Sequence, residues 1–200
     1  MTSVDERRLG DLVGDTVTIT KGFPTQRAQT DGDIRVMSVA ALRNAAVPRY
    51  FAGRDAIADV GLDVARMGDV LVSIEGGTVG ETLVVDEELG EFVPSQQVAT
   101  LRVLEPTQVD PWYLGAWLST DPAQEQLRRL TRGSAIQRIP IKDLSSLAVP
   151  LPPIAHQHEI SERYLAFEAA IRSHRAVAKC LEELRDLDLV TAFASGLRGP

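Results

Sequence analysis

The sequence predicts an α+β fold: a mixed α/β globular domain over residues 1–150, followed by a proline hinge and one long C-terminal coiled-coil helix over residues 151–200. Short β-branched runs fill the first region, without the regular alternation of strands and helices that a doubly wound sheet requires. Three prolines within residues 150–153 favour extended backbone, which predicts a stiff hinge. Beyond them the apolar residues follow heptad spacing, which predicts the helix.

Between turns rich in glycine, proline and aspartate, the first region contains several short runs typical of strands and helices. β-branched and apolar runs predict strands over residues 16–20, 34–39, 69–74, 82–85, 97–104, 135–139 and 147–151. An amphipathic pattern predicts a short helix over residues 4–13, and early prolines predict helix starts for residues 110–118 and 122–130.

The hydrophobic seam of the long helix alternates steps of four and three residues for about three heptads. The seam consists of Ile160, Tyr164, Phe167, Ile171, His174, Ala178 and Leu181. The predicted C-terminal helix would span roughly 60 Å, whereas a globular domain of the size of residues 1–150 is only roughly 35–40 Å across. We therefore expect the seam to meet a partner helix, most simply in a homodimer; a helix folded back along its own domain is the alternative.

The composition is that of an ordinary soluble globular chain, with 44% hydrophobic and 24% charged residues, so the chain has enough apolar side chains for a real core. A single cysteine excludes a disulfide framework and a cysteine-rich zinc site. No apolar run approaches the ~18 residues of a membrane span, and the N-terminus lacks the apolar stretch of a secretion signal. We expect a cytoplasmic protein without a membrane segment.

Basic residues are concentrated in two stretches of an otherwise acidic chain. The net charge of −7 argues against nucleic acid as a partner. However, residues 34–54 (the first basic window) contain four arginines and no acid, and residues 126–142 (the second basic window) contain four arginines, one lysine and no acid. Eighteen of the 21 basic residues are arginine, which suits bidentate contact with phosphate or guanine. Codon bias in a G+C-rich genome would produce the same preference for arginine.

No constellation of residues in the sequence predicts an active site. Residues 110–113 are similar to the Asp/Asn-Pro-Pro-aromatic signature of amino-group DNA methyltransferases but lack its second proline. None of the three lysines has an acid two residues before it, as a common type of metal-dependent nuclease requires. The glycine-rich turn at residues 76–80 lacks the Gly-Lys-Ser/Thr ending of a nucleotide-binding loop. We expect no catalysis, no metal and no cofactor in this chain.

Polar and basic residues suited to DNA gather at residues 95–97 and 132–138. Serine hydroxyls and backbone N–H groups bind phosphates, while glutamine and arginine side chains read base edges. The candidate DNA contacts are Lys21, Arg35, Gln97, Arg132, Ser134, Gln137 and Arg138. The alternative is that Arg132 and Arg138 only pair with surface acids such as Glu125 and Asp143.

Several short motifs follow one another along nearly the whole chain. They are Lys-Gly at residues 21–22, Gly-Asp-Val-Leu-Val-Ser at 68–73, Pro-Ser-Gln-Gln at 94–97, Pro-Trp-Tyr-Leu at 111–114, Gly-Ser-Ala-Ile-Gln-Arg-Ile at 133–139 and Val-Pro-Leu-Pro-Pro-Ile-Ala-His-Gln at 149–157. In this order they resemble the specificity (S) subunit of type I restriction–modification systems. The typical subunit has two domain–helix units in one chain, and this sequence resembles one of them.

The resemblance implies a non-catalytic DNA-recognition subunit. In that family a target recognition domain reads one half of a split DNA site, and the long helix packs against its counterpart and fixes the spacing of the half-sites. The implied partners are DNA, an adenine DNA methyltransferase that itself carries S-adenosylmethionine and, where it joins the complex, a restriction nuclease subunit. A homodimer would read two inverted half-sites. The alternative is an assembly module of a defence complex that has lost DNA binding.

Overall fold

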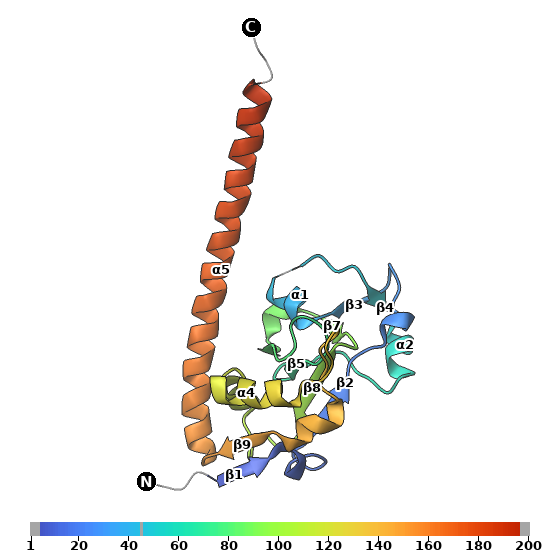
Figure 1. Cartoon of the computed structure of the whole chain (residues 1–200), viewed down its shortest axis with the longest axis vertical. Coiled ribbons are helices and arrows are strands. Elements are labelled where there is room, and N and C mark those ends of the chain that lie inside the picture. The colour runs from blue at the N-terminus through green and yellow to red at the C-terminus, as the bar shows by residue number, and fades with distance from the viewer. Residues whose placement is uncertain (1–4, 45, 197–200) are drawn as a thin grey trace. The chain divides into compact units, whose positions relative to one another are not determined.

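The computed structural model describes residues 5–44 and 46–196, and the chain divides into two compact units. The first unit, Met1–Ser161, holds the described strands and the shorter helices (Figure 1). The second unit, Glu162–Pro200, contains the remainder of α5 (Ile154–Gly196), a helix of 43 residues. The sequence placed the domain boundary after residue 150, whereas this division keeps about two turns of α5 with the globular unit.

The centre of the first unit is a four-stranded antiparallel sheet in the order β2-β8-β5-β6. Its strands are β2 (Val17–Lys21), β5 (Val70–Ser73), β6 (Thr82–Val84) and β8 (Val98–Val103). Lys21 pairs with Ala99, Ser73 pairs with Val98, and Thr82 pairs with the residue before Ser73. The last residues of β2 and β5 and the first residues of β6 and β8 therefore lie at one end of the sheet, which we call the sheet end.

The other described strands form two smaller sheets. β4 (Phe51–Ala52), β3 (Ile34–Met37) and β7 (Phe92–Pro94) form a three-stranded sheet, in which β3 is antiparallel to β4 and parallel to β7. β1 (Asp5–Arg8) pairs with β9 (Ala148–Leu151), so the start of the unit is tied to the strand that precedes α5.

Helices cover both faces of the central sheet. The shorter α-helices are α1 (Val39–Arg43), α2 (Arg54–Ala58), α3 (Pro111–Leu118) and α4 (Asp121–Leu130). The 3₁₀-helices are Leu9–Asp11, Thr25–Arg27, Glu87–Leu89 and Ile141–Ser146. A Cβ on Gly115 of α3 would lie 2.1 Å from Cγ2 of Val84, so glycine permits the close approach of this helix to β6. Successive residues of β5 point to opposite faces, which explains why Val70, on the α3 side, and Leu71, on the α1 side, are both fully buried.

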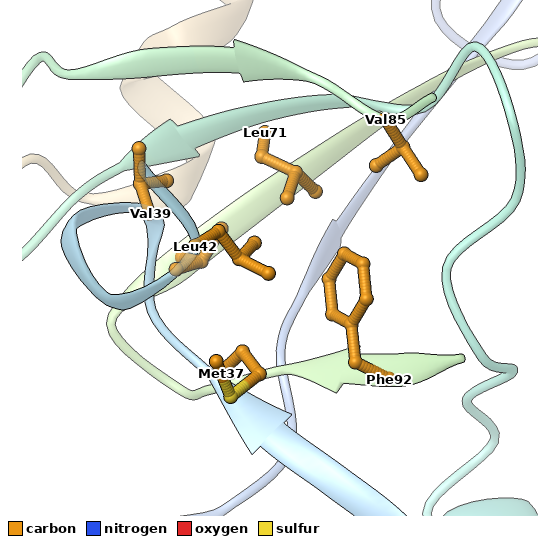
Figure 2. Close-up of a cluster of buried hydrophobic side chains, with 7 residues drawn as sticks. Met37, Val39, Leu42, Leu71, Val85 and Phe92 are labelled. Carbon is orange, nitrogen blue, oxygen red and sulfur yellow. The ribbon is translucent and has the colours of Figure 1, made fainter. Parts of the chain in front are cut away.

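One cluster of the hydrophobic core lies between the central sheet, the three-stranded sheet and α1. Leu71 of β5, Met37 of β3 and Phe92 of β7 meet Val39 and Leu42 of α1 (Figure 2). All of these side chains are at most 7% exposed. Burial contributes about 1.5–3 kcal/mol for an apolar side chain of this size. The packing of α1 and both sheets on one another therefore fixes the position of the sheet end within the unit.

The predicted α+β fold is confirmed, and so are most of the predicted elements. The strands predicted at residues 16–20, 34–39, 69–74, 82–85, 97–104 and 147–151 and the helices predicted at 110–118, at 122–130 and after the hinge are all present. The helix predicted at residues 4–13 is wrong over the described residues, since residues 5–11 form β1 and a 3₁₀ turn; residue 4 lies outside the described residues. Pairing of β1 with β9, a contact distant in sequence, overrides the local amphipathic pattern.

Candidate nucleic-acid interface

Two of the candidate DNA contacts lie at the sheet end, where two backbone segments approach closely. The N–H of Gly22 donates to the carbonyl oxygen of Val98 at 2.9 Å. A Cβ on residue 22 would lie 2.2 Å from the carbonyl oxygen of Ser95, so a larger residue does not fit. Glycine therefore lets the end of β2 meet the segment that leads into β8. Lys21 and Gln97 are held at this end with exposed side chains.

Residues 132–138 form an exposed hairpin, which we call the basic hairpin. Two backbone hydrogen bonds close its base, from Arg132 N to Arg138 O and from Arg138 N to Arg132 O, both at 2.8 Å. Gly133 has a φ of +94°, and a Cβ there would lie 2.3 Å from the carbonyl oxygen of Ile136. The strand predicted at residues 135–139 is therefore wrong: the chain turns back at this point, and only isolated bridges form.

The basic hairpin is hydrogen-bonded to the sheet end. Ile139 N donates to Ile74 O at 2.8 Å, and Gly76 N donates to Gln137 O at 3.0 Å. Ile74 N in turn donates to Gln97 O at 2.8 Å. These bonds join three segments that are far apart in the sequence. They bring together most of the candidates: Lys21, Gln97, Arg132, Ser134, Gln137 and Arg138, all of them exposed. We call the surface formed by these residues the sheet-end surface.

The glycine-rich turn between β5 and β6 adjoins the basic hairpin. Gly76 has a φ of +99°, and no neighbouring heavy atom lies within 4 Å of a Cβ built on Gly76 or Gly77. The hydroxyl oxygens of Ser73 and Thr78 lie 3.1 Å apart and brace the turn. The space over the two glycines is therefore open, and a ligand that reaches the sheet-end surface has close access to this backbone.

The arginines of the second basic window differ in how their charge is used. Arg132 Nη2 lies 2.6 Å from Asp143 Oδ2, as the surface-pairing alternative predicts. Arg128 and Arg129 both pair with Glu125, at 2.8 and 3.1 Å. The hydrogen bonds from Arg128, and then from Arg129, lower the pKa of the Glu125 carboxyl below its ordinary value. Arg138 has neither an ion pair nor a side-chain hydrogen bond within residues 5–44 and 46–196, so its guanidinium is available to a ligand.

Arg35 is not brought to the sheet-end surface. It lies on β3, and its guanidinium donates to the carbonyl oxygens of Leu89 and Glu91, the latter at 3.1 Å. Two other arginines of the first basic window are used in the same way: Arg43 donates to the Thr82 carbonyl, and Arg54 pairs with Glu91. The arginines of this window thus mainly hold the domain together.

Sequence reasoning passed over Glu75, which lies in the middle of this region. Glu75 follows β5 and forms an antiparallel bridge with Arg138. It also lines a small pocket together with Arg132, Gly133, Ile136 and Arg138. The only signal in the sequence was the position of an acid directly before the two glycines of the turn, and that position gives no indication of the basic neighbours.

The predicted seam lies on α5, and its members in the second unit are mostly exposed. Ile160 and Tyr164 are half-buried, while Phe167, Ile171, His174, Ala178 and Leu181 are exposed. The largest of these, Phe167, is 69% exposed. Exposed apolar residues continue toward the end of the helix with Leu184, Leu187, Val190 and Phe193. A long run of exposed apolar side chains marks an interaction surface.

The first turns of α5 are anchored to the globular unit by one buried side chain. Gln157 is 1% exposed, and its amide oxygen accepts from Asp110 N at 2.9 Å. Its amide nitrogen donates to the carbonyl oxygens of Gln108 and Pro152, at 3.1 and 2.9 Å. Asp110 also caps α3 by accepting from the N–H groups of Trp112 and Tyr113. The glutamine that ends the motif at residues 149–157 thus has a structural role that its spacing alone did not show.

In the part of the chain that the structure describes, no group of three or more His, Cys, Asp or Glu side chains is placed to hold a metal ion. Of the helices in residues 5–44 and 46–196, none is long and apolar enough to cross a membrane.

Comparison with known proteins points to one family. The model of the type I restriction modification DNA specificity domain matches residues 2–183. The specificity subunit of the type I restriction enzyme EcoBI from Escherichia coli is 34% identical over 98 residues, which are 49% of this chain and 20% of that protein. The type I restriction-modification S subunit of M. genitalium has a TM-score of 0.63 at 19% identity, over 93% of this chain and 45% of that one.

A second solved structure, described as showing complex assembly and conformational transition of the type I R-M system, matches with a TM-score of 0.59 at 22% identity. The match covers 94% of this chain and 44% of that one. The chain therefore spans just under half the length of the solved relatives. At these identities the structural likeness shows the shared fold.

Proposed function

Because the chain belongs to the type I restriction modification DNA specificity domain family, we propose that it recognises a DNA sequence and directs an adenine DNA methyltransferase to it. In this proposal the chain has no chemistry of its own, and S-adenosylmethionine is bound by the methyltransferase. A restriction nuclease subunit joins the same complex. The solved relative described as showing complex assembly of the type I R-M system supports these partners.

The observation that carries the proposal is the sheet-end surface. Backbone hydrogen bonds gather two cations, Lys21 and Arg138, and two glutamines, Gln97 and Gln137, onto one exposed surface of an acidic protein. Cations bind phosphates, and glutamine and arginine side chains read bases in the major groove. This combination suits sequence-selective contact with DNA better than it suits a generic solvated loop.

The test is to co-express the chain with the adenine methyltransferase of its system and to map methylated adenines on plasmid DNA. The expected result is a stable complex that methylates one defined sequence. A complex that methylates without sequence preference, or a chain that does not associate with the methyltransferase, would contradict the proposal. The methyltransferase expressed alone is the control, and it is expected to show little or no selective methylation.

The long helix supports a finer proposal, a homodimer that reads two inverted half-sites. Two copies of α5 packed as an antiparallel pair would cover Phe167 and Ile171 and relate two recognition domains by a two-fold axis. Replacing both residues with aspartate would leave unpaired carboxylates in that interface. We expect Phe167→Asp/Ile171→Asp to be monomeric by light scattering, while Ala166→Asp/Ala169→Asp, off the seam on the same turns, remains dimeric. A wild-type chain that is monomeric both alone and with the methyltransferase would exclude the dimer.

A second candidate function is an assembly module of the same complex without DNA binding. The net charge of −7 and the pairing of Arg132 with Asp143 favour it. The two functions differ in one measurement. If the complex of chain and methyltransferase binds duplex DNA no more tightly, and no more selectively, than the methyltransferase alone, the assembly module is the correct function.

A further inference from the structure

The pocket at the basic hairpin contains a carboxylate among cationic side chains. It is lined by Glu75, Arg132, Gly133, Ile136 and Arg138. The second basic window contributes no acid to this region, so Glu75, from the loop after β5, is the acidic side chain of the pocket. A carboxylate at this position calls for an explanation, because it opposes phosphate binding by the arginines around it.

Glu75 and Arg138 are neighbours in a short ladder. Arg138 is bridged in antiparallel fashion to Arg132 on one side and to Glu75 on the other. Residues directly opposite each other in antiparallel pairs have Cα atoms about 4.5–5.5 Å apart and side chains on the same face. Backbone hydrogen bonds of 2.8 Å on the Arg132 side and 3.0 Å between Gly76 and Gln137 hold this ladder. The backbone thus places the side chains of Glu75 and Arg138 next to each other on one face of the ladder.

The side chains of Glu75 and Arg138 do not form an ion pair with each other. Over the described residues, neither Glu75 nor Arg138 takes part in an ion pair or a side-chain hydrogen bond. Arg132 differs, since its guanidinium is bound to Asp143 at 2.6 Å. An acceptor and a fork of donors therefore stand next to each other, both unsatisfied by the protein. A ligand that satisfies both side chains must offer a hydrogen-bond donor to Glu75 and, beside it, acceptors to Arg138.

One base pair of DNA has this pattern. In the major groove, guanine presents the O6 and N7 acceptors that arginine binds in bidentate fashion, and cytosine presents the N4 amino donor that glutamate accepts. The two groups lie side by side in a C·G pair. A phosphate, in contrast, offers acceptors alone and would be repelled by Glu75.

We propose that Glu75 and Arg138 together read one C·G base pair in the major groove. Glu75 accepts a hydrogen bond from the cytosine amino group, and Arg138 donates to O6 and N7 of the paired guanine. The inference rests on the proposed DNA recognition and assigns its sequence selectivity at one position to a named pair of side chains. Glu75 is then a specificity-determining residue that sequence reasoning missed.

The experiment is selection from a randomised duplex DNA library by the complex of the chain with its methyltransferase, followed by sequencing. The wild-type complex is expected to enrich a site with C·G at the position read by the pair. Glu75→Gln should lower the preference for C·G at that position by about 5- to 150-fold and leave the other positions unchanged, with adenine gaining because glutamine pairs with adenine. Arg138→Ala should relax the same position and also weaken binding overall.

Two further variants isolate the role of Glu75. Glu105→Gln makes the same charge change after the other end of β8, where the side chain is exposed, and should select the wild-type site. Glu75→Asp keeps the charge but withdraws the carboxylate, and it should relax the same position as Glu75→Gln. Thermal unfolding of each variant checks that the domain is folded. We expect the variants to fold, because the backbone hydrogen bonds of the ladder do not use the side chain of residue 75.

The outcomes separate this inference from the proposed function. If Glu75→Gln strengthens binding to all sequences alike, Glu75 only repels phosphate or balances Arg138, and the base-pair assignment is overturned. An unchanged site in both Glu75 variants overturns it as well, while selective binding by the wild type would leave the proposed function standing. A wild-type complex that enriches no sequence would overturn both.

Discussion

The two basic windows of the chain have similar charge patterns, and the protein uses them in different ways. In the first basic window, Arg35, Arg43 and Arg54 are bound to carbonyl oxygens or to a carboxylate of their own domain. In the second, the basic hairpin projects from the sheet end, and Arg138 is left without a protein partner among the described residues. Both windows contain four arginines and no acidic residue.

The difference follows from what surrounds each window. The first window runs through β3 and α1, which pack against the core and lie next to loops whose carbonyl oxygens need donors. Guanidinium groups there satisfy acceptors that would otherwise lack partners. The second window includes the basic hairpin, whose tight turn has a positive φ at Gly133, and the residues of this hairpin are exposed to solvent. A basic run therefore indicates a binding surface only where the backbone leaves its guanidinium groups without internal acceptors.

The largest expected effect comes from removing the internal arginines of the first window. Arg35→Ala/Arg43→Ala leaves three carbonyl oxygens, those of Thr82, Leu89 and Glu91, without these donors. We expect the free energy of unfolding to fall by about 2–5 kcal/mol, since each lost hydrogen bond to a charged group costs about 1.5–3 kcal/mol and the sites are partly exposed. Urea unfolding measures the change, and Arg49→Ala, an exposed arginine of the same window, should remain within about 0.5 kcal/mol of the wild type.

The next effect should appear in DNA binding and not in stability. Arg138→Ala is expected to weaken DNA binding by the methyltransferase complex by about 1–3 kcal/mol, with an unchanged unfolding midpoint. The double variant Arg132→Ala/Arg138→Ala, measured at several salt concentrations, tests the whole hairpin, because loss of phosphate contacts would also flatten the salt dependence. Binding as tight as that of the wild type at every salt concentration would show that the basic hairpin does not contact DNA.

The fold was largely predictable because its strands and its long helix carry strong local patterns. Residues 70–72 are apolar, and two of them, Val70 and Val72, are β-branched. Pro111 stands at the first position of α3, so both elements could be placed from sequence. α1, α2, β4 and β7 are too short for a periodic signal and went unpredicted; they depend on contacts such as the packing of Leu42 on Leu71 and Phe92. β1 was mistaken for a helix because its partner, β9, lies more than 130 residues away.

The candidate site was predictable in its residues but not in its geometry. Gln97 and Arg138 could be chosen from their chemistry, yet nothing in the sequence shows that Ile74 hydrogen-bonds to both neighbouring segments. The sequence alone does not distinguish Arg35 from the candidates that lie on the sheet-end surface. Its carbonyl partners at residues 89 and 91 come close to β3 only through the parallel pairing of β3 with β7. Glu75 was missed for the converse reason: its basic neighbours are distant in the chain.

Arg132 should behave as an intermediate case between the two windows. Its side chain is 69% exposed and its guanidinium is paired with Asp143, so Arg132→Ala should lower the free energy of unfolding by less than about 1 kcal/mol. Its loss should weaken DNA binding less than the loss of Arg138, because the existing ion pair competes with DNA for the guanidinium. Titration of both single variants with the same duplex ranks them, and a larger loss for Arg132→Ala would reverse the assignment of roles within the hairpin.

The smallest expected effect concerns Glu125, which ties two arginines of the second window to α4. Because Arg128 and then Arg129 lower the pKa of its carboxyl, the ionised form is favoured in the folded state. The pairs therefore add stability above the ordinary pKa of a glutamate, and that contribution is lost as the pH falls through the lowered pKa. The Glu125 side chain is 46% exposed and its arginine partners are more exposed still, so the effect should be small and screened by salt. Thermal unfolding from neutral to acid pH should show a slightly flatter acid dependence for Glu125→Gln than for the wild type, and the difference should shrink at high salt. The Glu125→Gln variant also frees Arg128 and Arg129 from their ion pairs at neutral pH. We therefore expect this variant to bind DNA slightly more tightly than the wild type, to the same degree for every sequence. A gain confined to one sequence would mean that these two arginines read bases, which would extend the recognising surface from the basic hairpin onto α4.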